Sequence, residues 1–380
     1  GREAQRAVRP DLRIVVMSAT LDDRRLTEHL GNAPVISSAG RAHPVVTRYV
    51  GRDPSRRIEQ QVADTILRAH GSEAGSILAF LPGQAEIRRA AELLGASGLP
   101  AATDLAELHG GLDLIAQARA VAPPLEGRRK IVLATSIAET SITIEGVRIV
   151  VDCGLSRVPR YEPEIGVTRL DTVRVSRASA DQRRGRAGRT EPGICYRLWD
   201  EPQTAALLPF QAPEILSADL GSLTLDCAAW GATDPETLPW LDPPPQGALA
   251  AARALLESLG AIDGSGQLTD IGRRVRALPM PPRLARMLVA AAGIGCQREA
   301  ALVAAVLTER GFGGDSTDLD QRLVAARQDR SDRGRRLREL ADGWAEAVSV
   351  AAGRPRQDRR SARLLAFAYP DRVARARGAP

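Results

Sequence analysis

Short runs of apolar, largely β-branched residues recur through the first 200 positions of the 380-residue chain, and they constrain its fold more than any other feature. Such runs indicate buried strands. Helix-periodic segments stand between several of them, at Ile58–Ala69 and Gln84–Leu94. Strands that alternate with helices predict a parallel α/β sheet. The predicted strands are Arg13–Met17, Pro44–Tyr49, Ser76–Leu81, Lys130–Ala134, Arg148–Val151 and Ile194–Leu198.

One insert interrupts this alternation of strands and helices. Val158–Val175 holds two extended runs on either side of Glu164-Ile165-Gly166, a pattern typical of a β-hairpin. We therefore predict an α/β lobe built on a parallel sheet, with a hairpin insert at about residues 157–176.

The strand pattern ends after about Trp199, and helices rich in Ala, Leu and Arg follow. Asp242–Gln246 holds three consecutive prolines, which cannot continue a helix and therefore mark a boundary. An amphipathic helix at Gly247–Leu259, a glycine-rich turn at Gly260–Gly266 and a further helix from about Leu268 come next. This order predicts a small winged-helix module.

Residues from Pro281 to about Phe367 have helical periodicity and predict an α-helical bundle. Within it, Arg327–Arg338 is rich in arginine interleaved with Asp329 and Asp332. The mixed charge signs predict a solvated helix face with ion pairs along the helix. A nucleic-acid role for this segment is the less favoured alternative.

The balance and type of basic residues bear on the partner. The net charge of +6 favours an anionic partner. Lys130 is the only lysine among the 52 basic residues. A GC-rich genome is the favoured explanation of this bias, although arginine also binds phosphate groups through paired hydrogen bonds.

The four cysteines, Cys153, Cys195, Cys227 and Cys296, lie far apart, without a CxxC pair or a nearby histidine. Neither a zinc site nor a disulfide framework is predicted, so we expect no metal ligands in this chain and reduced cysteines in its cores. No apolar run of about 18 residues occurs, so no membrane span is expected. These features predict a cytoplasmic protein.

The most specific pattern in the chain is Asp181–Arg189, DQRRGRAGR. A helix that begins near Ala180 and advances about 100° per residue places Gln182, Arg186 and Arg189 within about 60° of one another. A site that directs hydrogen-bond donors at one small anion requires such an alignment. A solvated basic helix, the alternative, does not.

The remaining positions of this pattern are expected to have other tasks. Arg183 and Arg184 point away from the shared face and are therefore predicted to tolerate substitution. Gly185 and Gly188, three residues apart, allow the backbone to approach a neighbour closely.

The stretch QRRGRAGR resembles motif VI of superfamily 2 helicases, especially that of the DEAH-box family. Other motifs of that family have counterparts in the family's order: Ser18-Ala19-Thr20 for motif III, Phe80–Gly83 with Glu86-Ile87 for motif IV, and Ala134–Val147 for motif V. Leu268–Leu288, Pro213–Leu216 and Ala229–Gly231 resemble the accessory region. The combination is most similar to the HrpB-type group.

This resemblance implies a RecA-like fold for the sheet lobe, followed by a winged-helix domain and an α-helical ratchet-type domain. Residues 1–40 would be the C-terminal remnant of a first RecA-like lobe, and residues 41–200 the second lobe. Residues 201–280 would form a connector and the winged helix, and residues 281–380 part of the ratchet-type domain.

The resemblance also implies roles for single residues. Gln182, Arg186 and Arg189 would contact the triphosphate as γ-phosphate sensor and arginine fingers, and Glu145 would lie near the nucleotide. The residues implied to link the two motor lobes are Ser18, Ala19 and Thr20. The residues implied to contact nucleic acid are Thr135 and Thr140 of motif V and Arg160, Tyr161 and Arg169 of the hairpin.

Two motifs of the family do not occur in this sequence: a P-loop with Gly-Lys-Ser/Thr, and a DEAH tetrad. Both precede motif III in the family. The chain is therefore expected to begin inside the first lobe and to be inactive by itself. The cofactor would be ATP with Mg²⁺, the metal being held by the absent first lobe.

The implied activity is that of an ATP-dependent helicase, an ATP hydrolase that moves along nucleic acid. Its partner would be single-stranded or partly duplex nucleic acid, with RNA favoured over DNA. Two alternatives remain. One is a non-enzymatic nucleic-acid-binding module built on a degenerate helicase lobe. The other is a regulatory lobe that acts with the partner lobe of another ATPase.

Overall fold

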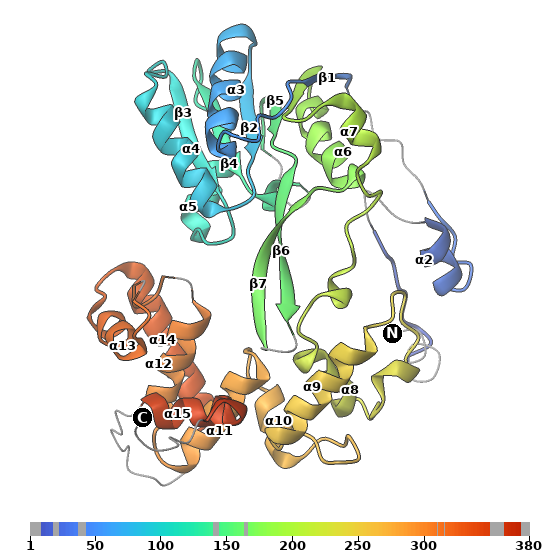
Figure 1. Ribbon diagram of the computed structural model, residues 1–380, viewed down its shortest axis with the longest axis vertical. Helices are drawn as coiled ribbons and strands as arrows, with labels where there is room; N and C mark the ends of the chain where they lie inside the picture. The colour runs from blue at the N-terminus through green and yellow to red at the C-terminus, as the bar shows by residue number, and fades with distance from the viewer. Residues whose placement is uncertain are drawn as a thin grey trace. The chain divides into compact units, whose positions relative to one another are not determined.

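The computed structural model describes residues 9–17, 23–36, 43–139, 144–162, 166–309, 311–314, 316–349 and 361–373. The chain divides into two compact units (Figure 1). The first comprises residues 1–160 and 169–213, and the second residues 161–168 and 214–380. The boundary therefore passes through the hairpin, whose tip groups with the second unit.

A six-stranded sheet forms the centre of the first unit, in the order β1-β8-β5-β2-β4-β3 (Figure 1). Every neighbouring pair is parallel, so the predicted α/β class is confirmed. Five of its strands coincide with predicted ones. The strands are β1 (Val45–Tyr49), β2 (Ser76–Phe80), β3 (Thr103–Leu108), β4 (Arg129–Ala134), β5 (Val147–Asp152) and β8 (Gly193–Arg197).

The strand β3 is not predicted by the apolar pattern. It lies at an edge of the sheet and pairs only with β4. An edge strand has a neighbour on one side only and tolerates polar residues such as Thr103, Asp104 and Glu107. These residues interrupt the apolar run from which a buried strand is inferred.

The predicted strand Arg13–Met17 is wrong. Residues 13–17 have no regular secondary structure, and Val15 and Met17 are 75% and 87% exposed. A strand requires a neighbour to satisfy its backbone hydrogen bonds. Within the described parts of the chain, no strand pairs with this run.

Helices cover both faces of the sheet. The helical elements of the first unit are α2 (Asp23–His29), α3 (Ile58–Ser72), α4 (Gln84–Ala96), α5 (Leu114–Val121), η1 (Ser136–Ala138), α6 (Arg177–Gly185), η2 (Arg186–Gly188) and α7 (Glu201–Ala205).

Side chains that alternate along each strand reach two separate cores. On β2, Ile77 and Ala79 pack in one core with α3 and α4. Leu78 and Phe80 pack in the other, which also contains Ala187 of η2. Burial on both faces explains why the central strands are apolar throughout.

The predicted hairpin is confirmed. It consists of β6 (Leu155–Glu162) and β7 (Val167–Arg174), which form a two-stranded sheet of their own (Figure 1). At its tip, the backbone N–H of Tyr161 donates to the carbonyl of Ser217 at 2.7 Å. Arg372 donates to the carbonyl of Gly166 at 3.3 Å. These contacts tie the tip to the second unit.

The second unit is helical, as predicted. A winged-helix order is present, because α9 is followed by a β-bridge between Ile262 and Leu268 and then by α10. One continuous core joins α8 through α15. The helical elements are η3 (Glu214–Leu216), α8 (Gly221–Ala229), η4 (Pro235–Thr237), α9 (Gln246–Ser258), α10 (Asp270–Arg276), α11 (Pro282–Gly293), α12 (Gln297–Thr308), α13 (Leu319–Gln328), α14 (Asp332–Ala347), α15 (Ser361–Ala368) and η5 (Pro370–Arg372).

The four cysteines are buried, as expected, and unpaired in the structure; their reduced state stays a prediction. Burial raises the pKa of Cys153 and of Cys195 to about 12. Neither thiol therefore ionises near neutral pH. No helix among the described residues is long and apolar enough to cross a membrane.

Candidate functional site

The segment with the arginine pattern is a helix that ends in a tighter turn. Ser176 begins α6, because its hydroxyl accepts a hydrogen bond from the backbone N–H of Ser179 at 3.1 Å. The helix ends at Gly185, and η2 continues as a 3₁₀ turn. A 3₁₀ turn advances about 120° per residue, so the helical face predicted for Gln182, Arg186 and Arg189 applies only up to Gly185.

Gly188 allows η2 to lie against β1. A Cβ atom at this position would lie 2.6 Å from the carbonyl oxygen of His43 and 2.7 Å from a methyl carbon of Val45. The predicted close approach is therefore found at Gly188. At Gly185, a Cβ would meet no described neighbour within 4 Å.

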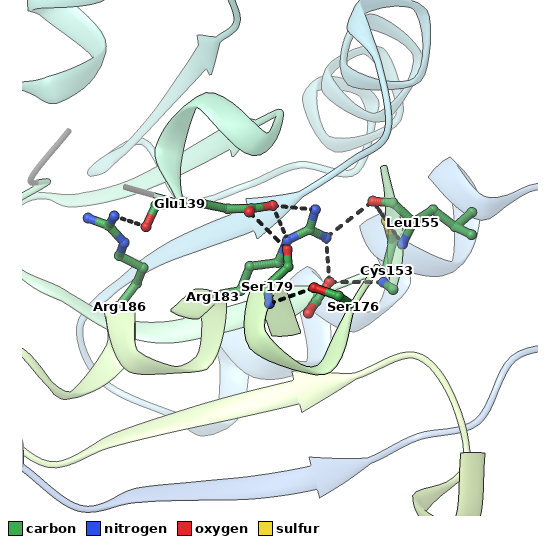
Figure 2. Close-up of polar contacts among 9 residues, drawn as sticks. Glu139, Cys153, Leu155, Ser176, Ser179, Arg183 and Arg186 are labelled. Carbon is green, nitrogen blue, oxygen red and sulfur yellow. Dashed lines mark hydrogen bonds and ion pairs between the residues drawn. The ribbon is translucent and has the colours of Figure 1, made fainter. Parts of the chain in front are cut away.

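Arg183 is the largest fully buried side chain among the described residues. Its Nε donates to a carboxylate oxygen of Glu139 at 2.8 Å (Figure 2). Its Nη1 donates to Asp152 at 2.8 Å. Nη1 also donates to the carbonyl of Leu155 at 3.2 Å. The guanidinium carbon lies 4.8 Å from the centre of the Phe80 ring, a cation–π distance.

The second terminal nitrogen of Arg183 completes this ion-pair cluster. Nη2 lies 2.7 Å from Glu139, without hydrogen-bond geometry to any described residue. It therefore contributes charge attraction rather than a directed bond. Burial alone would lower the pKa of Arg183, but the carboxylates of Asp152 and Glu139 raise it above its ordinary value. Arg183 is thus a fixed cation.

The expectation that Arg183 tolerates substitution is wrong. The inner face of α6 lies over the carboxyl end of β5, where Asp152 has 0% exposure, and over the turn that follows β4. Removing the guanidinium would leave two carboxylates desolvated without their counter-ion. Arg184 is exposed, and for it the expectation of tolerance stays a prediction.

Glu139 connects the helix α6 to the turn after β4. Its other carboxylate oxygen accepts a hydrogen bond from the hydroxyl of Ser179 at 2.8 Å. Its backbone carbonyl accepts a hydrogen bond from Nη2 of Arg186 (Figure 2). Three residues of the α6–η2 segment therefore hold this one glutamate.

Arg186 is a buried cation close to a second one. Burial, followed by the charge of Arg189, lowers the pKa of Arg186 to about 10, while Glu139 opposes this shift. Arg186 therefore stays protonated at neutral pH. Arg186 is the first residue of η2 and Arg189 directly follows that turn, with Gln182 half-buried on α6 and Arg189 exposed.

The other predicted site residues are distributed over several elements. Thr135 is half-buried between β4 and η1, with its backbone N–H bonded to the carbonyl of Leu108 at 3.1 Å. Glu145 is exposed in the turn before β5. Four predicted residues lie outside the described residues: Ser18, Ala19, Thr20 and Thr140.

The hairpin residues differ in exposure. Arg160 and Arg169 are exposed, and Arg160 lies 3.8 Å from Asp171 on the opposite strand. Tyr161 is half-buried in the second unit. Burial, and then the charge of Asp219, raises the pKa of its hydroxyl group.

Sequence reasoning missed the acidic partners of Arg183. Asp152 ends the buried strand β5, and polar residues at the carboxyl ends of parallel strands commonly face a functional edge. The position of Asp152 at the end of a buried strand could therefore have identified it as a candidate site residue from the sequence. Glu139 has no comparable signal, because its role depends on the packing of α6 against the turn.

The domain composition defines the class of protein. The helicase conserved C-terminal domain matches residues 59–191, which include the Glu139–Arg183 cluster. The winged-helix part of the helicase-associated domain HA2 matches residues 252–280, and its ratchet-like part matches residues 281–344. The chain thus holds a helicase conserved C-terminal domain followed by the two parts of the helicase-associated domain HA2.

The similar proteins narrow this class to a family. The chain is 43% identical over 379 residues to the ATP-dependent RNA helicase HrpB of Escherichia coli (strain K12). The matched region covers 99% of this chain and 45% of that protein. It is 39% identical over 310 residues to HrpA of the same strain, covering 79% and 24%. The chain belongs to the DEAH-box family of superfamily 2 helicases, in its HrpB-type group.

Solved structures agree with this assignment. A crystal structure of Escherichia coli DEAH/RHA helicase HrpB has a TM-score of 0.87 at 42% identity, covering 99% of this chain and 47% of that one. A crystal structure of the Escherichia coli DExH-box NTPase HrpB has a TM-score of 0.82 at 42% identity, covering 99% and 45%. The chain spans just under half the length of the HrpB proteins and about a quarter of the length of HrpA.

Proposed function

We propose that this chain supplies the second motor lobe and the associated domains of an ATP-dependent helicase that moves along single-stranded or partly duplex RNA. Arg186 and Arg189 are the arginine fingers of that site, and Gln182 senses the γ-phosphate. Glu145 lies near the nucleotide. Ser18, Ala19 and Thr20 link the two lobes.

The position of two arginines in one short turn at the end of α6, Arg186 as the first residue of η2 and Arg189 directly after it, is the observation that carries this proposal. Arg186 is buried, and the nearby charge of Arg189 contributes to lowering its pKa. An anion between two such cations relieves their repulsion. Phosphoryl transfer requires cations at the oxygens where negative charge develops, and this pair supplies them.

Binding of Mg²⁺ and of the nucleotide phosphates requires protein groups beyond these arginines. Mg²⁺ would be held by a P-loop and an acidic tetrad, motifs that this sequence does not contain. The ion supplies charge neutralisation of the β- and γ-phosphates. We accordingly propose that the 380-residue chain by itself hydrolyses no ATP above background.

Nucleic acid is proposed to contact the turn after β4 and the hairpin. Thr135 and Thr140 would hold the backbone of one strand, and Arg160, Tyr161 and Arg169 would contact strands near a duplex junction. Phosphate contacts then dominate binding, which should weaken steeply with salt and depend little on sequence. The unpaired cysteines support a cytoplasmic location.

RNA-stimulated ATP hydrolysis by the full-length protein tests this proposal. We expect hydrolysis that single-stranded RNA increases more than single-stranded DNA of the same length, and none from the 380-residue chain alone. A full-length protein that binds RNA without hydrolysing ATP would be a non-enzymatic binding module and would contradict the proposal. ATP hydrolysis by the 380-residue chain alone would contradict the proposal that this chain needs a separate phosphate-binding lobe for activity.

A further inference from the structure

The β6–β7 hairpin has no buried core of its own. Every residue of β6 and of β7 is exposed or half-buried. A two-stranded hairpin by itself is at best marginally stable in water. Contacts outside the two strands must therefore fix the position of the hairpin.

Four side chains of the second unit form a compact group of charged and aromatic residues. The guanidinium of Arg283 on α11 donates two hydrogen bonds to the carboxylate of Asp371 in η5, at 2.6 and 3.0 Å. Arg283 also donates to the carbonyl of Ala368 at 3.1 Å. The guanidinium carbons of Arg283 and Arg372 lie 5.2 and 4.8 Å from the centre of the Tyr369 ring, both cation–π distances. We call Arg283, Tyr369, Asp371 and Arg372 the hairpin latch.

The hairpin latch is bonded to the hairpin just before β7 begins. Arg372 donates to the carbonyl of Gly166 at 3.3 Å. A Cβ at Gly166 would lie 3.1 Å from Nη2 of Arg372 and 3.6 Å from Nη2 of Arg283, and its φ of +58° favours glycine. At the end of β6, the backbone N–H of Tyr161 donates to the carbonyl of Ser217 at 2.7 Å. The second unit thus holds the hairpin beside both of its strands.

Two arginines proposed to contact nucleic acid lie next to these attachment points in the sequence. Arg160 directly precedes Tyr161, and Arg169 follows Gly166 by three residues. Both arginines are exposed. A duplex that meets them exerts a force on the hairpin. Because the hairpin lacks a core, it would bend under that force unless its end is held, and the base pairs would stay closed.

We propose that the hairpin latch fixes the hairpin to the second unit, so that the hairpin separates a duplex as a rigid wedge. This inference rests on the proposed function. The four latch residues are positioning residues, which hold the hairpin and do not bind nucleic acid themselves. The latch is then required for strand separation, but not for ATP hydrolysis or for binding of a single strand.

The test uses the full-length protein and a duplex with a single-stranded RNA overhang. It measures duplex separated per ATP hydrolysed, kcat with saturating single-stranded RNA, and Kd for that RNA. Arg372→Ala removes the bond to the Gly166 carbonyl. We expect separation per ATP to fall about tenfold, as for the loss of one charge-assisted hydrogen bond. The kcat and the Kd should stay within about twofold of the unaltered values, as for a change at the surface.

Asp371→Asn distinguishes the latch from a phosphate-binding site made by the same arginines. The variant removes the negative charge beside Arg283 but keeps the shape of the side chain. We expect separation per ATP to fall about threefold with an unchanged Kd, because the amide oxygen still accepts one of the two hydrogen bonds. If Arg283 and Arg372 bound phosphate directly, loss of the carboxylate would instead tighten RNA binding. That result would overturn the inference.

Arg298→Ala is the matched control, since Arg298 is an exposed arginine on α12 of the same unit. It should leave separation per ATP unchanged. If Arg372→Ala does not fold, Asp371→Asn decides, because it keeps the size of the side chain.

A purely structural role for the latch predicts a different result. Thermal unfolding would shift, and duplex separation and kcat would fall by the same factor. That equal fall, or unchanged separation per ATP in both folded variants, would overturn the inference. An unaltered protein that hydrolyses ATP with RNA but separates no duplex would also overturn it. An unaltered protein that hydrolyses no ATP with RNA would instead refute the proposed function, so the two failures are distinguishable.

Discussion

Asp181–Arg189 and Arg327–Arg338 are both rich in arginine, yet the fold uses their arginines differently. In the first segment, Arg183 has 0% exposure and pairs with carboxylates 31 and 44 positions away in the sequence. In the second, Arg335 is more than half exposed and pairs with Asp332, three residues before it. Composition therefore does not set the importance of an arginine. The importance of an arginine depends on how deeply its side chain is buried and on which carboxylate it pairs with.

The second segment also matches its own prediction in part. It comprises the end of α13 and the first half of α14, and its arginines lie along helices. Arg327 pairs with Glu299 of α12 at 2.5 Å, and Arg338 donates to the carbonyls of Ala326 and Asp329. These bonds join helices, so the face is less solvated than the charge pattern predicts.

Replacing the buried arginine gives the largest expected loss of stability. Arg183→Met should lower the free energy of unfolding by about 3–5 kcal/mol, because it leaves the buried Asp152 and the half-buried Glu139 without a counter-ion. Urea unfolding of the 380-residue chain measures this. Arg184→Met, the matched surface change, should stay within about 0.5 kcal/mol of the unaltered chain. Equal effects of the two changes would contradict the ranking of arginines by burial.

A second variant separates the buried charge from the lost packing. Combining Arg183→Met with Asp152→Asn and Glu139→Gln removes the uncompensated carboxylates, so it should recover about 1–4 kcal/mol of the loss. The same urea titration measures the recovery. No recovery would indicate that the guanidinium matters for its packing on Phe80 rather than for its charge.

The ion pair between helices in the second unit should have a smaller effect. Arg327→Ala should cost about 1 kcal/mol or less, since the arginine side chain is 41% exposed and solvent screens the pair. The loss should diminish further at high salt. A salt-independent loss near that of Arg183→Met would show that the second segment resembles the first.

The exposed pair within α14 should have the smallest effect. Arg335→Ala removes an ion pair between residues three positions apart, which typically stabilises a helix by about 0.3–0.5 kcal/mol. Thermal unfolding of this variant beside Arg327→Ala orders the two pairs. A larger loss for Arg335→Ala would contradict the ranking by exposure.

The sequence predicted elements whose cause is local and missed those whose cause is packing. Apolar runs identified five central strands, because burial on both faces requires apolar residues throughout. The edge strand β3 needs no such run and was missed. Arg13–Met17 has such an apolar run but no pairing strand among the described residues. The apolar pattern alone therefore predicted a strand that does not form.

The candidate site shows the same limit. Helical periodicity, drawn as a helical wheel, predicted that Arg183 points away from the shared face and tolerates substitution, because it considers one helix by itself. The wheel contains neither Asp152 nor Glu139, which reach α6 from other elements. The turn η2 also departs from the helix on which the wheel depends. Motif resemblance predicted a shared role for Gln182, Arg186 and Arg189 but could not reveal the carbonyl to which Arg186 donates.

The turnover of Arg189→Ala tests the central claim most directly, because Arg189 is the exposed member of the proposed pair of arginine fingers. In the full-length protein with saturating RNA, we expect kcat for ATP hydrolysis to fall about 10³-fold or more, the effect of losing an arginine finger. Thermal stability should stay that of the unaltered protein. A kcat within about twofold of the unaltered value, the variation expected of a surface arginine, would contradict the assignment of Arg189 to the nucleotide site.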